Sequence, residues 1–275
     1  MRGGAERKNG RLRVIIYIVI TIVSGVGQNH AGEPKSPPSL SFPGLQSGPA
    51  LAMYYNPASL ALLENASFAC NFQNHFATKE LNDLGFSFQK GKKNDGYCIV
   101  YEKKGPVFYC RQDLSFGYGR QLGPNIQCGI KLKYRHLSVP DENYKASAMS
   151  FDLGVQSAIG KKIRFSALLK DPIAYEFRQQ KLTPASVEMG VLWQPDPEWV
   201  LLLEIHKISS FRPCLMLGAC IRPGSSTTAW IKFYSNPWQT EVGWGLQLKK
   251  CQIYSYANYH TVLGLSPGLI LCRFF

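Results

Sequence analysis

The sequence of 275 residues predicts an all-β chain that closes into an antiparallel transmembrane barrel of about 14 strands. Three observations predict this fold class. Apolar and polar residues alternate with a period of two, strand-like runs recur from residue 66 to the end of the sequence, and the links between these runs tend to alternate between short and long.

The alternation is clearest in three runs. In the first, Met149, Phe151 and Leu153 are separated by Ser150 and Asp152. Residues 187–194 and 241–249 repeat the pattern. Because residues two apart lie on the same face of a strand, each run predicts a strand with one apolar and one polar face.

All runs of this kind together predict fourteen strands. Most are close to the 9–11 residues that a tilted membrane strand needs. The predicted strands are 66–76, 83–90, 96–103, 112–122, 125–138, 147–159, 161–170, 185–194, 198–206, 212–222, 227–235, 239–248, 251–260 and 268–275.

The links between the predicted strands differ at the two ends of the barrel. After even-numbered strands they are mostly tight, and after odd-numbered strands they are mostly longer, with a short exception at residues 235–238. Outer-membrane barrels have short periplasmic turns and longer external loops. The tight links are 122–125, 160–161, 222–225 and 249–250, and the longer ones are 103–111, 139–146, 171–184, 207–211 and 260–267.

The part before the strands divides into two segments. Residues 1–27 have a basic head followed by 13 mostly apolar residues, 14–26, and predict a signal peptide cut after Gly27 or Ala31. A helix of that length spans only about 20 Å, less than the roughly 30 Å of a bilayer core. Residues 28–65 are rich in Pro, Ser and Gly and predict an irregular segment, a candidate plug, before a barrel at 66–275.

Charge and cysteine content exclude some classes of partner. The formal net charge is +13, but the basic residues are scattered singly, which argues against nucleic acid and favours outer-membrane lipid and lipopolysaccharide. The eight cysteines also occur singly, mostly within predicted strands. We interpret them as small half-buried residues, with one or two cross-strand disulfides as the alternative.

The sequence contains no set of residues that predicts an enzyme, a cofactor or a metal site. The five histidines lie far apart, with no carboxylate pattern around them. Residues 264–268 fit the pattern G-x-S-x-G, but that nucleophile motif requires a helix and a histidine after it, and the seven residues that follow predict a strand. We therefore predict a non-enzymatic protein.

The last ten residues form a predicted turn and an apolar strand that stops on an aromatic residue. Gly268, Phe274 and Phe275 resemble the C-terminal signal that the barrel-assembly machinery reads in outer-membrane barrels. Arg273 departs from that signal, which usually has an apolar residue or Tyr at this position. This resemblance implies the assembly machinery as a partner.

Residues 54–61, Tyr-Tyr-Asn-Pro-Ala-Ser-Leu-Ala, come just before the first predicted strand. Together with the C-terminal strand, the strand count and the phrases at 116–123 and 260–266, they resemble the FadL-type outer-membrane barrel family, in particular its Bacteroidota branch of PorV/PorQ-like proteins. The resemblance implies that Asn56, Pro57 and Ala58 lie in the lumen as part of a plug. An ordinary turn closed by Pro57 is the alternative.

The resemblance implies a location in the cell outer membrane and two functions. One is a scaffold in protein secretion or surface attachment, with secretion-system proteins as partners. The other is a channel for hydrophobic small molecules. The short links and the short plug favour the scaffold slightly. The alternative from another class is a soluble periplasmic or secreted β-sandwich binding protein.

Overall fold

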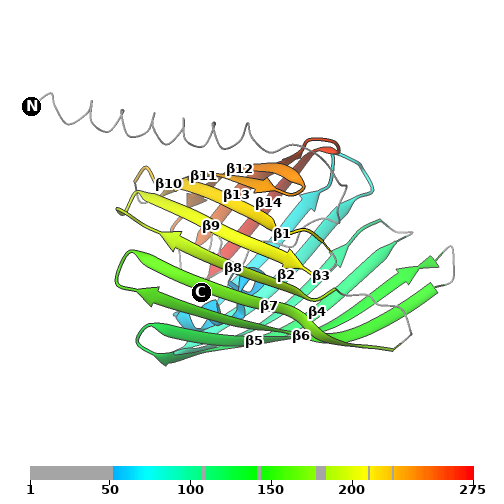
Figure 1. Ribbon diagram of the computed structural model, residues 1–275, viewed down its shortest axis with the longest axis horizontal. Helices are drawn as coiled ribbons and strands as arrows, with labels where there is room; N and C mark the ends of the chain where they lie inside the picture. The colour runs from blue at the N-terminus through cyan, green and yellow to red at the C-terminus, as the bar shows by residue number, and fades with distance from the viewer. Residues whose placement is uncertain (1–51, 107–108, 141–143, 178–183, 210, 225) are drawn as a thin grey trace, which may run out of the picture. The chain divides into compact units, whose positions relative to one another are not determined.

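The fold is a single antiparallel sheet of fourteen strands that closes on itself (Figure 1). The computed structural model describes residues 52–106, 109–140, 144–177, 184–209, 211–224 and 226–275. Each strand pairs with its neighbours in the sequence, and β1 (Ser67–Asn74) pairs with β14 (Gly264–Phe274). This closed single sheet confirms the predicted fold class and excludes the two-sheet sandwich.

The other strands follow one another through short links. They are β2 (Asn82–Lys92), β3 (Asp95–Lys104), β4 (Cys110–Gly123), β5 (Ile126–Val139), β6 (Tyr144–Ile159), β7 (Ile163–Glu176), β8 (Ser186–Trp193), β9 (Trp199–Ile208), β10 (Cys214–Ile221), β11 (Thr227–Ser235), β12 (Trp238–Gln247) and β13 (Cys251–His260).

Two short helical turns precede the sheet. They are α3 (Ala52–Tyr55) and the 3-10 turn η1 (Pro57–Leu62), drawn in blue in Figure 1. We call residues 52–63 the plug. Because the strand number is even, β1 begins and β14 ends at the same end of the barrel, and η1 packs there against β3–β6. We call this the plug end and the opposite one the far end.

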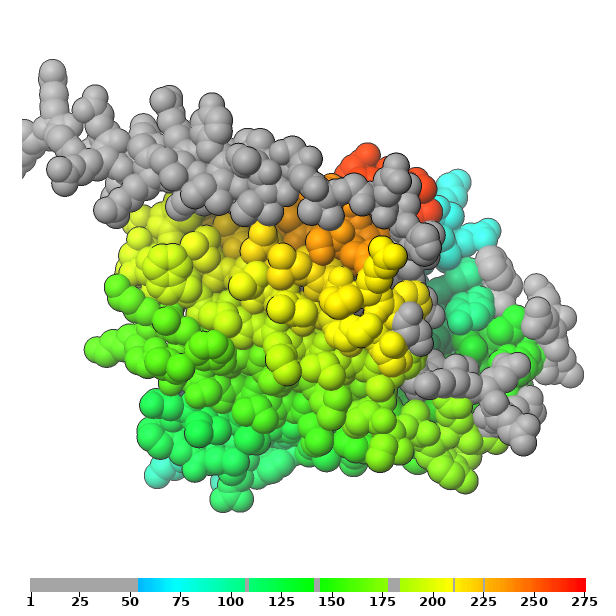
Figure 2. Space-filling model, in the orientation of Figure 1, coloured from blue at the N-terminus to red at the C-terminus, as the bar shows by residue number. Residues whose placement is uncertain are grey.

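The alternation of the sequence separates the two faces of the sheet. On β4 the side chains of Leu114 and Phe116 are 37% and 55% exposed, while Ser115 between them is 4% exposed. The three runs singled out in the sequence follow the same rule, with their apolar residues on the outer face. Figure 2 shows one part of this face, where strands from the middle of the chain lie side by side. Such an apolar exterior is what a lipid bilayer requires of a barrel.

The predicted number of strands is confirmed, but two strands begin or end far from the predicted residues. β7 continues to Glu176 instead of stopping at Lys170, and β14 begins at Gly264 instead of Gly268. Each of these two regions contains a proline. Pro172 lies within the register shift between β6 and β7 and beyond the residues of β7 that pair with β8, and Pro267 lies where β14 pairs with β13 alone. A proline is tolerated where one edge of a strand is unpaired.

The predicted difference in length between the links at the two ends of the barrel is present, but it is smaller than the sequence predicts. Links at the plug end are two to five residues long, and those at the far end are two to nine. The long link predicted at 260–267 is wrong, because β14 begins early and leaves only three residues, 261–263. The short exception is confirmed, since only Asn236 and Pro237 separate β11 from β12.

Strand length varies around the barrel. β4, β5, β6 and β7 have 14–16 residues, whereas the remaining ten strands have 8–11. The extra residues of β7 extend toward the far end, past the first residue of β8. The wall is therefore higher on the side of β4–β7.

The eight cysteines are free thiols on the strands. Cys98, Cys214, Cys220 and Cys272 are buried, and the other four are half-buried. Four of the eight are thus half-buried, as the sequence predicts, four are fully buried, and the structure contains none of the alternative disulfides among these eight.

The predicted signal peptide, residues 1–27, lies outside the described residues, as does the segment 28–51. Both remain predictions. None of the helices in the described part of the chain is long and apolar enough to cross a membrane.

We expect the folded full chain to be recovered in the membrane fraction and to migrate differently on a gel before and after boiling, because detergent alone does not open a closed barrel. Electrophoresis of boiled and unboiled samples checks this. Recovery in the soluble fraction, with no change of mobility on boiling, would contradict a transmembrane barrel.

Candidate functional site in the barrel lumen

The plug is fastened by the side chain of Asn56, which is completely buried. Its Oδ1 accepts a hydrogen bond from the backbone N–H of Ala58 at 2.9 Å and so caps η1. Its Nδ2 donates to Ser166 Oγ at 2.8 Å and to the carbonyl of Ala167 at 3.2 Å, both on β7. The Asn56 side-chain amide thus accepts the hydrogen bond of a backbone N–H at the start of the 3-10 turn and also bonds this turn to β7.

Glycines in the wall make room for the plug. A Cβ at Gly96 on β3 or Gly119 on β4 would clash with the backbone of Leu60 or Pro57. On the next two strands, a Cβ at Gly129 would meet Pro57, and one at Gly154 would meet the Asn56 side chain. Close approach of two backbones requires glycine. These four residues, the glycine track, therefore mark where the plug lies.

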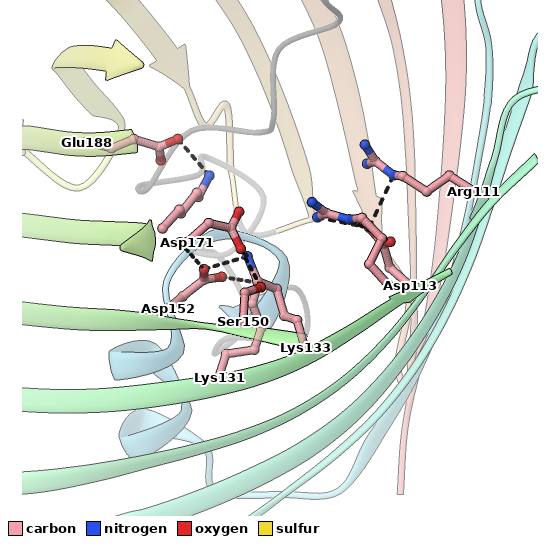
Figure 3. Close-up of polar contacts among 10 residues, drawn as sticks. Arg111, Asp113, Lys131, Lys133, Ser150, Asp152, Asp171 and Glu188 are labelled. Atoms are coloured by element: carbon pink, nitrogen blue, oxygen red, sulfur yellow. Dashed lines mark hydrogen bonds and ion pairs between the residues drawn. The ribbon is translucent and has the colours of Figure 1, made fainter. Parts of the chain in front are cut away.

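The lumen face of β4–β7 carries buried ion pairs (Figure 3). In the centre, Lys133 Nζ lies 2.6 Å from a carboxylate oxygen of Asp152 and 2.6 Å from one of Asp171. Lys131 approaches the same Asp152 at 3.2 Å. Ser150 Oγ donates to Asp171 at 2.5 Å. This central cluster joins β5, β6 and β7 at the register shift between Ser150 and Asp152.

Two further clusters flank the central one, and a third lies across the lumen. Arg111 and Arg135 hold Asp113 at 3.4 and 3.0 Å. On β7–β9, Lys170 binds Glu188 at 2.6 Å, and His206 lies between Glu188 and Glu204.

The cluster across the lumen lies on β11 and β12, where Lys232 and the indole N–H of Trp230 both donate to Glu241. Buried charges persist only when paired in this way.

The opposite part of the lumen carries a cluster of buried apolar side chains beside the ion pairs of Glu204 and Lys232. Twelve buried side chains on β1, β8–β11, β13 and β14 form one cluster, which we call the apolar wall. At its centre the rings of Trp230 and Tyr254 lie 6.1 Å apart, edge to face. Tyr54 and Tyr55 of the plug pack against it. The members are Ala69, Leu192, Val200, Leu202, Cys214, Met216, Cys220, Trp230, Tyr234, Tyr254, Ile270 and Cys272.

The residues that the sequence singled out lie on two different parts of the barrel. Asn56, Pro57 and Ala58 are buried in the lumen against β4–β7. Gly268 and Phe274 face the lumen from β14.

Phe275 follows β14 and is 63% exposed, with the Arg273 guanidinium 5.6 Å from its ring centre. The structure does not test whether Gly268, Phe274 and Phe275 are read during assembly.

The sequence analysis missed the ion-pair clusters and the glycine track. A signal for the clusters is present on β5, where Lys131, Lys133 and Arg135 alternate with the outward-facing Ile130 and Leu132. Within the described residues, no group of three or more His, Cys, Asp and Glu side chains is placed to hold a metal ion.

Comparison with known proteins shows the fold. The monoaromatic hydrocarbon channel CymD superimposes with a TM-score of 0.64 over 84% of this chain and 94% of its own, at 11% identity. The toluene transporter TodX of Pseudomonas putida gives a TM-score of 0.63 over 81% of this chain and 91% of its own, at 9% identity. A Pseudomonas aeruginosa FadL homologue gives a TM-score of 0.55 over 82% of this chain and 93% of its own, also at 9% identity. This chain shares their fold.

No family model and no curated protein matches the sequence. At these identities the superposition establishes the architecture, a fourteen-stranded transmembrane barrel of the kind seen in these hydrocarbon channels, and nothing about the ligand.

Replacing Asn56 with Ala should loosen the plug without opening the barrel. The variant loses the cap of η1, which is worth about 0.5–2 kcal/mol, and the bonds to β7. We expect amide hydrogen exchange in residues 58–63 to accelerate about tenfold or more. The matched control is Asn74→Ala, which removes side-chain bonds to Thr78 and Asn82 in the β1–β2 hairpin. Unchanged exchange in Asn56→Ala would show that Asn56 does not hold the plug.

Replacing Asp152 with Asn should destabilise the barrel by about 3–5 kcal/mol, because it leaves Lys131 and Lys133 buried with too little negative charge. Urea titration in lipid vesicles, followed by tryptophan fluorescence, measures this loss. The control Asp95→Asn breaks the exposed pair with Arg120 and should cost less than about 1 kcal/mol. Equal losses in the two variants would mean that the lumen pairs are as weak as surface pairs.

Proposed function

We propose that this protein is an outer-membrane channel for small hydrophobic molecules, among them aromatic hydrocarbons. The observation that carries the proposal is the apolar wall, which lines a barrel with the fold of monoaromatic hydrocarbon channels and toluene transporters. Ligand sites are mostly apolar and aromatic, with a few polar groups that set orientation. Trp230, Tyr254 and Met216 supply such a surface.

The two-sided lumen fits passage of an apolar molecule. The charged side, β4–β7, is rigidly paired and fastens the plug through Asn56 and Ser166. On the opposite side, Tyr54 and Tyr55 of the plug pack against the apolar wall. Contacts of aromatic rings with Met, Leu and Tyr are less directional than the bonds of Asn56. An apolar ligand would therefore travel along the apolar wall, where the lumen offers it apolar and aromatic side chains.

A scaffold in protein secretion or surface attachment is the second candidate function. It is favoured by the buried ion pairs, because a lumen held together by Lys133, Asp152 and Asp171 is closer to a filled barrel than to an open pore. The resemblance to PorV/PorQ-like proteins belongs to this candidate and stays a prediction, as do the secretion-system, lipopolysaccharide and assembly-machinery partners.

The test is uptake of radiolabelled toluene by cells that carry the chain in an outer membrane without another hydrocarbon channel. We expect initial uptake several-fold above cells with an empty vector. Met216→Gln introduces an amide into the apolar wall, where burying a polar group is costly, and should lower uptake several-fold.

The matched control is Met189→Gln, the same change on the outer face, where Met189 is 58% exposed. It should leave uptake unchanged. Uptake at the level of the empty vector, by a barrel that still shifts on boiling, would reject the channel. Retention of secretion proteins on the tagged chain in that case would favour the scaffold.

A further inference from the structure

The outer face of β3–β6 changes from apolar to polar near the far end of the barrel. The last apolar row contains two tyrosines, and every side chain of the next row toward the far end is polar. In register across the four strands, the apolar row is Tyr101, Leu114, Tyr134 and Met149, and the polar row is Lys103, Gln112, His136 and Ser147. Aromatic residues mark the level at which a barrel leaves the hydrocarbon and meets the lipid headgroups. The polar row therefore lies at the level of the headgroups.

A hollow of about 280 Å³ opens at this level and is lined by Tyr134, Lys145, Ser147 and Phe177. The Tyr134 hydroxyl donates to Ser147 Oγ at 3.1 Å, and the same oxygen lies 3.0 Å from Nδ1 of His136. The backbone N–H of Phe177 bonds the carbonyl of Ser147 at 2.9 Å, which holds the end of β7 beside the hollow. The hollow thus brings together an ammonium group, two hydroxyls and an aromatic ring on the outside of the barrel.

The lysine of the hollow carries a charge that no carboxylate of the described residues balances. Lys145 is exposed and, like Lys103 in the polar row, has no carboxylate oxygen within 4.0 Å among those residues. The lumen lysines Lys131 and Lys133, by contrast, are both paired with Asp152. A lysine at the level of the headgroups attracts anionic lipid. Lys145 differs from Lys103 in that it also lines a hollow.

The position of the hollow matches a lipid whose charge lies directly above its acyl chains. Lys145 pairs in register with Ser138, which lies four residues beyond Tyr134 toward the far end, so the ammonium group belongs above the apolar row. The links at the far end reach nine residues, whereas those at the plug end have at most five. Because longer loops face the cell exterior in outer-membrane barrels, the hollow lies in the outer leaflet. The lipid of that leaflet is lipopolysaccharide, whose lipid A part carries phosphate groups.

We infer that Lys145, Ser147 and Tyr134 form a site on the outside of the barrel for a phosphate group of lipopolysaccharide. Lys145 supplies the charge and up to three donors, and the two hydroxyls can turn to donate to phosphate oxygens. Phe177 and Met149 are exposed beside the hollow and offer apolar surface to the acyl chains. The inference rests on the outer-membrane location in the proposed function, but not on the passage of toluene.

The site is tested with the full chain in detergent, by native mass spectrometry with lipid A as the probe. We expect lipid A to bind at least tenfold more tightly than the same lipid with its phosphates removed. Lys145→Gln should weaken lipid A binding about tenfold, and Tyr134→Phe and Ser147→Ala about threefold each. The matched control is Lys103→Gln, which removes the same charge from the same level of the outer face but away from the hollow, and should change binding less than twofold.

Three results would overturn the inference in a barrel that still shifts on boiling. They are undiminished binding in Lys145→Gln, an equal loss in Lys103→Gln, and equal binding of the lipid without phosphates. Displacement of lipid A by an equal concentration of inorganic phosphate would assign the hollow to the free anion and reject the lipid. Loss of lipid A binding with toluene uptake retained would reject only this site, and lipid A binding without toluene uptake would reject only the channel.

Discussion

The pairing of β1 with β14 is the constraint on which the rest of the structure depends. Seven residue pairs, from Ser67 with Phe274 to Gln73 with Gly268, close the sheet. In a hydrocarbon environment an open strand edge costs several kcal/mol for each unpaired backbone group, so the strands persist there only as a ring. Once the ring is closed, every residue of a strand faces either outward or inward.

This separation gives the lumen its chemistry. Apolar side chains such as Phe116 and Met149 occupy the outward positions, so the polar residues of the strands face the lumen. There the Lys133–Asp152–Asp171 cluster neutralises charges that would otherwise be buried alone. The interior is thus a consequence of closure.

Much of the fold is readable from the sequence, because the period-two pattern is a local property of each strand. It predicts all fourteen strands, and it assigns faces correctly where the apolar residues are large, as in residues 149–155. It misses the end of β7 around Pro172 and the start of β14 around Pro267, because whether a strand can continue through a proline depends on whether a neighbouring strand pairs on that side. That information lies in residues distant along the chain.

The candidate site is less accessible to sequence reasoning for the same reason. Asn56 can be noticed as a helix-capping residue before Pro57, but its partner Ser166 is 110 residues away. The glycine track is spread over four strands, and each member is unremarkable alone. Asp113, Asp152 and Glu188 become a lumen network only when the register of every intervening strand is known, since a slip of one residue would turn them to the outside.

The unequal strand lengths have a consequence for how the barrel sits in a bilayer. β6 has sixteen residues and β8 has eight, a difference of about 26 Å along the strands at about 3.3 Å per residue. With a tilt of about 45° this amounts to roughly 19 Å along the membrane normal, about two thirds of a hydrocarbon core. At the plug end the two strands end level, with Ile159 of β6 and Trp193 of β8 both paired with Ile163, so the surplus of β6 lies at the far end, where it extends beyond β8 on one side of the barrel. The mouth at the far end is then a slanted opening, low beside the apolar wall and high beside the charged clusters, so that the direction from which a solute arrives decides which chemistry it meets first.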